Sequence, residues 1–219
     1  YDAMNETLAR LHQADHVKLG LEDFGKPGSY FSRQISRWGK QYVASETESI
    51  PAMNKLMEWL PHHIPPGERA GIVHGDYRLD NMILHPTEPR VLAVLDWEIS
   101  TIGDPLADFT YHIMQWRMPA GGTGGGTGSL TGADLKALGI PSEGEYVAMY
   151  CKRTGRLGIE NLDFYFAYNF FRIAGILQGI VGRVRDGTAA SAHATTMAAN
   201  VRPLAELGWE YAKRAGAKD

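Results

Sequence analysis

Four polar side chains that could perform chemistry together lie within residues 72–98. His74 and Asp76 follow a short apolar run. Asn81 comes five residues after Asp76, and Asp96 directly follows a second apolar run. A carboxylate can accept the proton of a hydroxyl group, and carboxylate and amide oxygens are ligands that Mg²⁺ accepts. Transfer of a phosphoryl group from magnesium-bound ATP to a hydroxyl group uses these elements.

The alternative is a β-hairpin whose Asp and Asn residues only shape turns, because both residue types favour turns. Three details argue against it. Gly75 precedes Asp76 directly after the apolar run, where the chain must turn sharply. The step from Asp76 to Asn81 matches the D-x-x-x-x-N spacing of kinase catalytic loops. Asp96 is presented at a strand end beside that loop. Together they favour a catalytic site over a plain hairpin.

The glycine-rich segment 120–132 is the only low-complexity part of the sequence. A phosphate-binding P-loop needs a lysine near its end and a strand before it, and this segment has neither. We therefore expect a flexible surface loop that could act as a substrate flap.

Two pairs of histidines could suggest a metal site. His12 and His16 are four residues apart in a helical pattern, but Gln13 stands where the glutamate of a zinc-protease motif would be. The pair His62 and His63 lies beside prolines. Packing or surface roles are favoured over zinc binding.

Composition limits the classes of function. A formal net charge of −3 over 219 residues gives no electrostatic argument for binding nucleic acid or an anionic membrane. No apolar run approaches the roughly 20 residues of a membrane span. Cys151 is the only cysteine, so an internal disulfide is excluded. A reducing, cytoplasmic location is therefore predicted.

Apolar periodicity predicts a mostly helical chain. Helices are expected over residues 1–16, 29–45, 50–60, 104–116, 133–138, 142–154, 162–185 and 192–215. Strands are expected over residues 70–73, 82–84 and 91–95, with the last two forming a hairpin. The predicted fold class is mainly α with a small β-hairpin sheet.

Three segments carry a resemblance to a known family. The sequences HGDYRLDN at 74–81, VLDWE at 94–98 and GDPLADF at 103–109 resemble the large lobe of the aminoglycoside phosphotransferase and choline kinase family. The resemblance covers essentially the whole chain. It is nearest to the branch of kinase-like domains associated with acyl-CoA dehydrogenases, through these segments and FGKPGSYFSRQISRW at 24–38.

The resemblance implies the C-terminal lobe of a protein-kinase-like α+β fold. It implies a catalytic loop and metal site at 72–98, the flexible loop at 120–132 and a helical substrate subdomain at 133–219. ATP would be the co-substrate and Mg²⁺ the cofactor.

The same resemblance implies roles for five residues. Asp76 would orient the acceptor hydroxyl and take its proton. Asn81 and Asp96 would hold Mg²⁺ against the nucleotide phosphates. His74 would pack beneath the catalytic loop, and Asp108 would anchor the backbone of that loop.

Arg78 has two interpretations from sequence alone: it could contact a phosphate, or it could pair with a nearby acid. Asp104 followed by Pro105 indicates the start of a helix, with the aspartate as N-cap.

Kinases of this kind bind ATP between two lobes, and the N-terminal lobe supplies a strand lysine for the phosphates. The chain begins at Tyr1, and no strand-rich segment or lysine of this type precedes its first helix. We expect it to be the C-terminal lobe of a longer enzyme, with weak magnesium-nucleotide binding and little turnover on its own. An exposed cleft face would also favour self-association, such as a homodimer.

The charged residues in and before the predicted long helix indicate the class of acceptor. Arginines outnumber acids in and just before the predicted long helix: Arg153, Arg156, Arg172, Arg183 and Arg185. This favours an anionic acceptor such as a hydroxyacyl-CoA, with Arg172 as a candidate substrate or phosphate ligand. The arginines could instead lie on a solvated face or near a helix C-terminus, where cations are favoured.

Two other functions remain as alternatives. An aminoglycoside kinase would need an acidic acceptor pocket for its polycationic substrate. A non-catalytic binding lobe would have no need of Asp76, Asn81 and Asp96 together.

Overall fold

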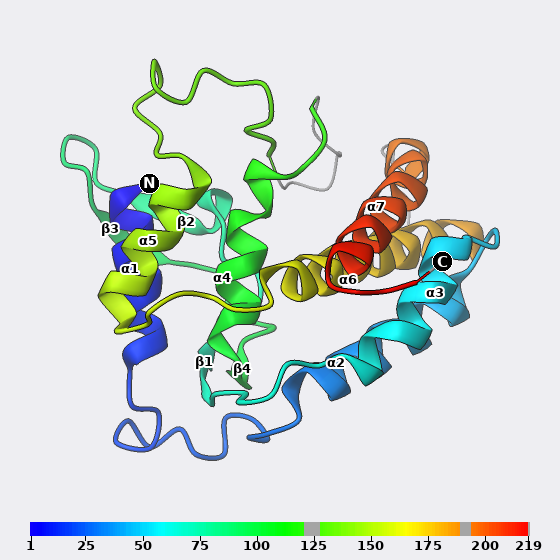
Figure 1. Ribbon diagram of the computed structural model, residues 1–219, viewed down its shortest axis with the longest axis horizontal. Coiled ribbons are helices and arrows are strands. Elements are labelled where there is room, and N and C mark those ends of the chain that lie inside the picture. The colour runs from blue at the N-terminus through cyan, green and yellow to red at the C-terminus, as the bar shows by residue number, and fades with distance from the viewer. Residues whose placement is uncertain (121–127, 189–193, 219) are drawn as a thin grey trace. The chain divides into compact units, whose positions relative to one another are not determined.

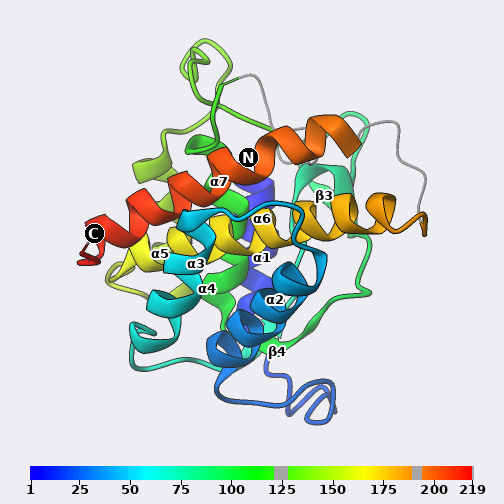
Figure 2. The same cartoon turned by 90° about the vertical axis from the view of Figure 1, so that its right-hand side faces the viewer.

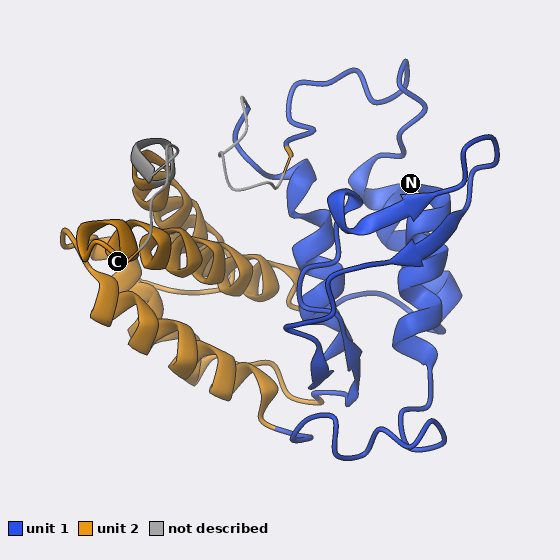
Figure 3. Ribbon diagram, turned by 180° about the vertical axis from the view of Figure 1, so that it is seen from behind, with its two compact units in different colours: residues 1–28, 68–120, 129–160 blue, residues 29–67, 121–128, 161–219 orange. Residues whose placement is uncertain are grey.

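The computed structural model describes residues 1–120, 128–188 and 194–218 (Figure 1). The chain forms two compact units, shown in different colours in Figure 3. Unit 1 comprises Tyr1–Gly28, Glu68–Ala120 and Ser129–Glu160. Unit 2 comprises the described residues of Ser29–Gly67, Gly121–Gly128 and Asn161–Asp219. The centre of the predicted flexible loop, 121–127, lies outside the described residues.

Unit 1 contains three α-helices and four short strands among its described residues. The helices are α1 (Asp2–Gln13), α4 (Pro105–Ile113) and α5 (Glu143–Thr154), and single 3₁₀ turns cover Leu79–Asn81 and Met114–Trp116. The strands are β1 (Gly71–Val73), β2 (Met82–Leu84), β3 (Val91–Val94) and β4 (Thr101–Gly103).

The strands form two separate antiparallel pairs. β1 pairs with β4, placing Ile72 opposite Ile102. β2 pairs with β3 in the predicted hairpin, with an irregular register between Ile83 and Leu84. The prediction of a single small sheet therefore needs correction, because β4 gives β1 a partner of its own.

The start of α4 shows how local sequence specifies this unit. The Asp104 carboxylate accepts a hydrogen bond from the Leu106 N–H at 2.8 Å, and Pro105 occupies the first turn, as predicted. The buried ring of Phe109 in α4 stacks on Tyr150 of α5, with 3.8 Å between the ring centroids. The cap fixes where α4 begins, and the stacked rings fix the helix against α5.

The predicted helix over residues 133–138 is wrong, because this segment forms turns. Six residues make too few hydrogen bonds to offset the cost of nucleating a helix. Gly139, with φ of +65°, then redirects the chain. α5 begins only after Ser142, whose side chain and that of Glu145 form a reciprocal capping box.

Unit 2 contains four α-helices in the described residues. They are α2 (Tyr30–Ser45), α3 (Pro51–Trp59), α6 (Leu162–Arg185) and α7 (Ala194–Arg214), and a 3₁₀ turn at Leu60–His62 follows α3. α6 and α7 lie against each other, as Figures 1 and 2 show. These helices agree closely with the predicted ranges.

Close helix contacts in unit 2 depend on small residues. A Cβ at Gly208 of α7 would come within 3.1 Å of the Leu56 side chain and 3.2 Å of Phe170. Phe170 and Phe171 of α6 are fully buried. The aromatic residues of α6 thus form much of the core of unit 2. Within the described ranges, no helix has both the length and the apolar character required to cross a bilayer.

His112 of α4 is a buried titratable group in unit 1. Its Nε2 lies 2.8 Å from the Tyr146 hydroxyl, and its Nδ1 is buried with no hydrogen-bond partner. Burial lowers the pKa of His112 from 6.5 to about 4. Below pH 6.5 the unfolded chain therefore binds a proton that the folded chain does not, so stability falls as pH falls from 6.5 to 4.

A comparison of the wild type with His112→Gln isolates this effect. The unfolding free energy of the wild type, relative to the variant, should fall by about 1.4 kcal/mol per pH unit across that window. Urea unfolding at a series of pH values measures it, and carboxylate titration common to both proteins cancels. A difference that does not change with pH would show that His112 is not held neutral.

Candidate active site

The catalytic loop, residues 74–81, starts where β1 ends at Val73. Gly75 has a φ of +90°, which side chains rarely adopt. A Cβ at Gly75 would also lie 3.1 Å from the carbonyl oxygen of Ile99. The sharp turn before Asp76 therefore depends on glycine at this position.

The Asp108 carboxylate lies under the start of this loop. It accepts hydrogen bonds from the backbone N–H groups of His74, at 2.5 Å, and Gly75, at 2.7 Å. Its side chain is 1% exposed, and Nε2 of His12 lies 3.4 Å away. Burial by itself raises the pKa of Asp108, but the interaction with His12 and the two loop N–H groups outweigh burial and lower this pKa. The loop therefore rests on an ionised carboxylate from α4.

His74 is fully buried and connects the two ends of the site. Its Nδ1 accepts a hydrogen bond from the Asp76 N–H at 3.2 Å, so Nε2 carries the proton and donates to the Leu95 carbonyl at 2.9 Å. This tautomer follows from the two partners, because a backbone N–H only donates and a carbonyl only accepts. His74 thus ties Asp76 to the chain that leads into Asp96.

The Asp76 carboxylate is held from two sides. The amide Nδ2 of Asn81 donates to Oδ2 at 2.9 Å and also to the Asp76 carbonyl at 2.9 Å. The Tyr111 hydroxyl donates to Oδ1 at 2.6 Å. Tyr111 was not predicted from sequence; it follows Asp108 by three residues in α4, a spacing that puts both side chains on one face.

Arg78 lies beside two acids of the same loop. Its Nε is 3.3 Å from Oδ2 of Asp76, and its Nη1 is 3.6 Å from Asp80. This is the pairing that one of the two interpretations anticipated. Contact between Arg78 and a phosphate stays a prediction.

Asn81 and Asp96 are joined through backbone. The Leu95 N–H donates to the Asn81 carbonyl at 2.8 Å, directly before Asp96. Asp96 has an exposed side chain and a φ of +66°. This left-handed conformation costs a non-glycine residue on the order of 1 kcal/mol, although Asp tolerates it better than most. Backbone strain of this kind is concentrated at functional sites.

The donor set fits Mg²⁺. Nδ2 of Asn81 donates to Asp76, so Oδ1 is the atom of this amide that could bind a metal, and Asp96 offers a carboxylate. Across the described ranges, no three His, Cys, Asp or Glu residues are grouped closely enough to hold a metal by themselves. Mg²⁺ in nucleotide sites is held by one or two protein oxygens, with phosphates and water completing the octahedron.

The arginines on which the anionic-acceptor prediction rests have varied surroundings. Arg153 pairs with Asp2 at 2.7 Å, and Arg185 pairs with the adjacent aspartate. Arg172 belongs to unit 2, where it is 7% exposed and its guanidinium lies 5.7 Å from the ring centroid of Trp38. Its assignment as a substrate or phosphate ligand stays a prediction.

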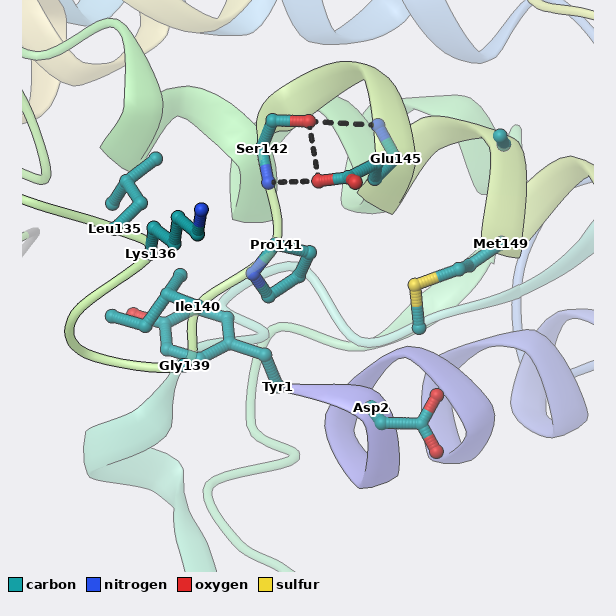
Figure 4. A pocket seen from close by; sticks show the side chains of 11 residues that line it. Tyr1, Asp2, Leu135, Lys136, Gly139, Ile140, Pro141, Ser142, Glu145 and Met149 are labelled. Atoms are coloured by element: carbon teal, nitrogen blue, oxygen red, sulfur yellow. Dashed lines mark hydrogen bonds between the residues drawn. The ribbon is translucent and has the colours of Figure 1, made fainter.

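Pocket size alone does not identify this site. A pocket of about 920 Å³ in unit 1 is lined by residues that include Tyr1, Ile140 and Met149 (Figure 4). None of its lining residues belongs to the catalytic loop. Hydrogen bonding around Asp76 is therefore the better guide to the chemistry.

Known proteins are similar to this chain in sequence. Mouse acyl-CoA dehydrogenase family member 10 is 46% identical over 219 residues, which cover 99% of the chain and 20% of that protein. Human acyl-CoA dehydrogenase family member 11 is 41% identical over 216 residues, or 98% of the chain and 27% of that protein. The chain thus spans about a quarter or less of these relatives.

Two solved structures have similar folds. A Ralstonia eutropha JMP134 protein, provisionally described as an aminoglycoside phosphotransferase, is 57% identical with a TM-score of 0.92. The match covers all of this chain and 65% of that one. Choline kinase LicA from Streptococcus pneumoniae is 16% identical with a TM-score of 0.59, covering 95% of this chain and 62% of that one, and shows the fold alone.

These relationships confirm the predicted mainly α, kinase-like fold, in which the structure has small antiparallel sheets. They support a kinase-type enzyme. Residues 1–151 match the phosphotransferase enzyme family, and the chain belongs to that family.

Proposed function

We propose that the chain forms the catalytic portion of an ATP- and Mg²⁺-dependent phosphotransferase that acts on the hydroxyl group of a small molecule. The observation that carries this proposal is the Asp76 carboxylate, held by Tyr111 and Asn81 in a loop anchored on Asp108. A carboxylate fixed in this way can align an acceptor hydroxyl for in-line attack.

Each residue has a defined task in this proposal. Asp76 orients the hydroxyl group and accepts its proton. A strong base is not needed, because the hydroxyl proton leaves late in a loose transition state. Asn81 and Asp96 would hold Mg²⁺, which supplies neutralisation of the phosphate charge. Arg78 lies beside two acids of the loop. When nucleotide binds, its guanidinium would leave these acids and contact a phosphate instead.

Asp96→Asn tests the metal role. Asparagine tolerates the left-handed conformation, so without ligand its unfolding free energy should match the wild type within about 0.5 kcal/mol. Magnesium-dependent protection by ATP, about 2.7 kcal/mol at a hundred times Kd, should be largely lost. Thermal-shift assays with and without Mg²⁺ measure both quantities, on residues 1–219 and on the complete polypeptide where the open reading frame is longer.

Asp80→Asn is the matched control, because Asp80 is an exposed acid of the same loop. It should keep the magnesium-dependent protection. Equal protection of the wild type and Asp96→Asn would contradict the metal assignment. Equal loss of the magnesium-dependent protection in Asp96→Asn and Asp80→Asn would contradict it too.

For the acceptor, the proposal is an anionic hydroxyl compound, specifically a hydroxyacyl-CoA. Its support is the run of arginines around α6 and the names of the acyl-CoA dehydrogenase family relatives, which match nearly the whole chain. The aminoglycoside alternative is supported by the description of the Ralstonia protein.

Transfer of ³²P from ATP by the complete polypeptide distinguishes the two acceptor classes. Labelled hydroxyacyl-CoA with no labelled aminoglycoside supports the proposal. Efficient aminoglycoside phosphorylation with no transfer to hydroxyacyl-CoA contradicts it. Nucleotide binding without transfer to any hydroxyl compound would point to the non-catalytic binding lobe.

A further inference from the structure

A second polar cavity lies in unit 1 and contains none of the residues assigned to phosphoryl transfer. Its volume is about 310 Å³. The polar residues that line it come from the end of α1, the segment before β1 and the end of α5: His12, Gln13, Arg69, Tyr150, Thr154 and Arg156. Two of these side chains are guanidinium groups, and none is a carboxylate.

Arg156 is held in place by backbone. Gly155 ends α5 with a φ of +66°, and the Arg156 N–H returns to the Cys151 carbonyl at 2.9 Å. Its Nε is buried and has no hydrogen-bond partner. In the described part of the chain, neither Arg156 nor Arg69 has a carboxylate oxygen within ion-pair distance.

The nearest acids already have other donors. Asp104 accepts the N–H groups of Leu106 and Arg69, at 2.8 and 3.1 Å. Asp108 accepts the N–H groups at the start of the catalytic loop. Asp108 also interacts with His12, and Asp104 feels the positive charge of Arg156 without forming an ion pair with it.

One other polar group of the cavity, the Tyr150 hydroxyl, interacts with the guanidinium of Arg156, while the remaining polar groups are engaged elsewhere. The Thr154 hydroxyl donates to the Tyr150 carbonyl at 2.8 Å, and the Tyr150 hydroxyl is paired with Nδ1 of His12 at 2.7 Å. The Gln13 amide donates to the Arg153 carbonyl at 2.8 Å. The cavity thus has more strong donors than acceptors, which is the balance expected of an anion site.

A simpler explanation covers only part of this arrangement. A cation just after a helix C-terminus is stabilised by the helix dipole, and Arg156 follows α5. Arg69 is at no helix end, and the dipole leaves the buried Nε of Arg156 without an acceptor. An unmade hydrogen bond from a buried N–H of a charged side chain is costly, so a ligand oxygen would be stabilising there.

We propose that this cavity binds a phosphate-type oxyanion through Arg69 and Arg156, as free phosphate or as part of a small organic phosphate. Guanidinium groups match the geometry of such oxyanions with paired hydrogen bonds. His12 lines the same cavity and contacts Asp108 at 3.4 Å, so the bound anion lies one side chain away from the support of the catalytic loop. The site is separate from the proposed magnesium-nucleotide site and does not depend on it.

Isothermal titration of residues 1–219 with inorganic phosphate, at constant ionic strength, tests the proposal. Arg69→Gln and Arg156→Gln should each weaken phosphate binding by about tenfold or more, as expected when one charged donor group is lost. Arg90→Gln removes a charge from the exposed hairpin of the same unit and should bind phosphate like the wild type. Circular dichroism confirms that each variant is folded.

Asp96→Asn separates this site from the catalytic one. Phosphate affinity unchanged in Asp96→Asn but reduced in both arginine variants supports the proposal, whatever the outcome for phosphotransfer. Glycerol phosphate binding tighter than inorganic phosphate would identify an organic phosphate as the ligand, and the reverse would identify free phosphate. The absence of saturable binding by the wild type overturns the proposal, as does equal affinity in the wild type and an Arg69→Gln, Arg156→Gln double variant.

Discussion

Replacing Asp76 with asparagine is expected to lower kcat for phosphoryl transfer by about 10²- to 10⁴-fold, the range typical for loss of a positioned proton acceptor. The carboxamide keeps the size of the side chain and one oxygen that can accept from Tyr111. It cannot take the proton of a hydroxyl group, and its NH₂ would face the Asn81 amide, which donates to Asp76 in the wild type. KM for ATP should change little, because Asp76 is not a proposed metal ligand.

Steady-state kinetics on the complete polypeptide measure this effect, and two companion variants sharpen it. Asp80→Asn lies in the same loop and should retain most of the wild-type kcat. Tyr111→Phe removes the hydrogen bond to Oδ1 and should give a kcat between those of the two other variants, because the carboxylate remains but loses this donor. An Asp76→Asn variant with more than about half of the wild-type kcat would rule out the proton-acceptor role.

Asp108→Ala is expected to destabilise the fold by about 2–6 kcal/mol, because two buried backbone N–H groups lose their acceptor at about 1–3 kcal/mol each. The two groups belong to His74 and Gly75, and the lost carboxylate also removes the partner of Nε2 of His12. The lost hydrogen bonds are those of the turn directly before Asp76. Loss of stability and loss of catalysis should therefore appear together.

Urea unfolding of residues 1–219 gives the free energy directly. Asp23→Asn is the matched control, since Asp23 is an exposed acid of unit 1, and it should stay within about 0.5 kcal/mol of the wild type. Asp108→Asn should fall between them, because one oxygen can still accept a loop N–H. An alanine variant as stable as the control would mean that water replaces the carboxylate at no cost.

The helices were predictable because their signals are local. Asp104 and Pro105 mark the start of α4, and regular apolar spacing marks α2 and α6. β4 was not predictable, because Ile102 is the one large apolar residue in its sequence, whereas the equally short β2 is an apolar run. Its partner β1 lies about 30 positions earlier in the chain. Such pairing depends on tertiary contacts, which the spacing of residues in the sequence does not predict.

In the candidate site, too, some residues have a local sequence signal and others depend on tertiary contacts. Asp76 and Asn81 were found from their fixed spacing within one loop. His12 was interpreted as a packing or surface histidine. Its contact with Asp108 spans 96 positions, so no local sequence pattern could predict that contact. Tyr111 is nearer to Asp108, but its distance from Asp76 depends on how α4 lies against the loop.

The backbone of Leu95 is bonded on both sides to the catalytic loop: its N–H to the Asn81 carbonyl, and its carbonyl to His74. Its side chain is 44% exposed. The placement of Asp96 therefore depends on the two backbone groups of residue 95 rather than on its side chain. Homologues should vary freely in side chain at this position and yet exclude proline, which has no N–H to donate. The proposed metal ligand, Asp96, would then keep its position even when the side chain before it changes.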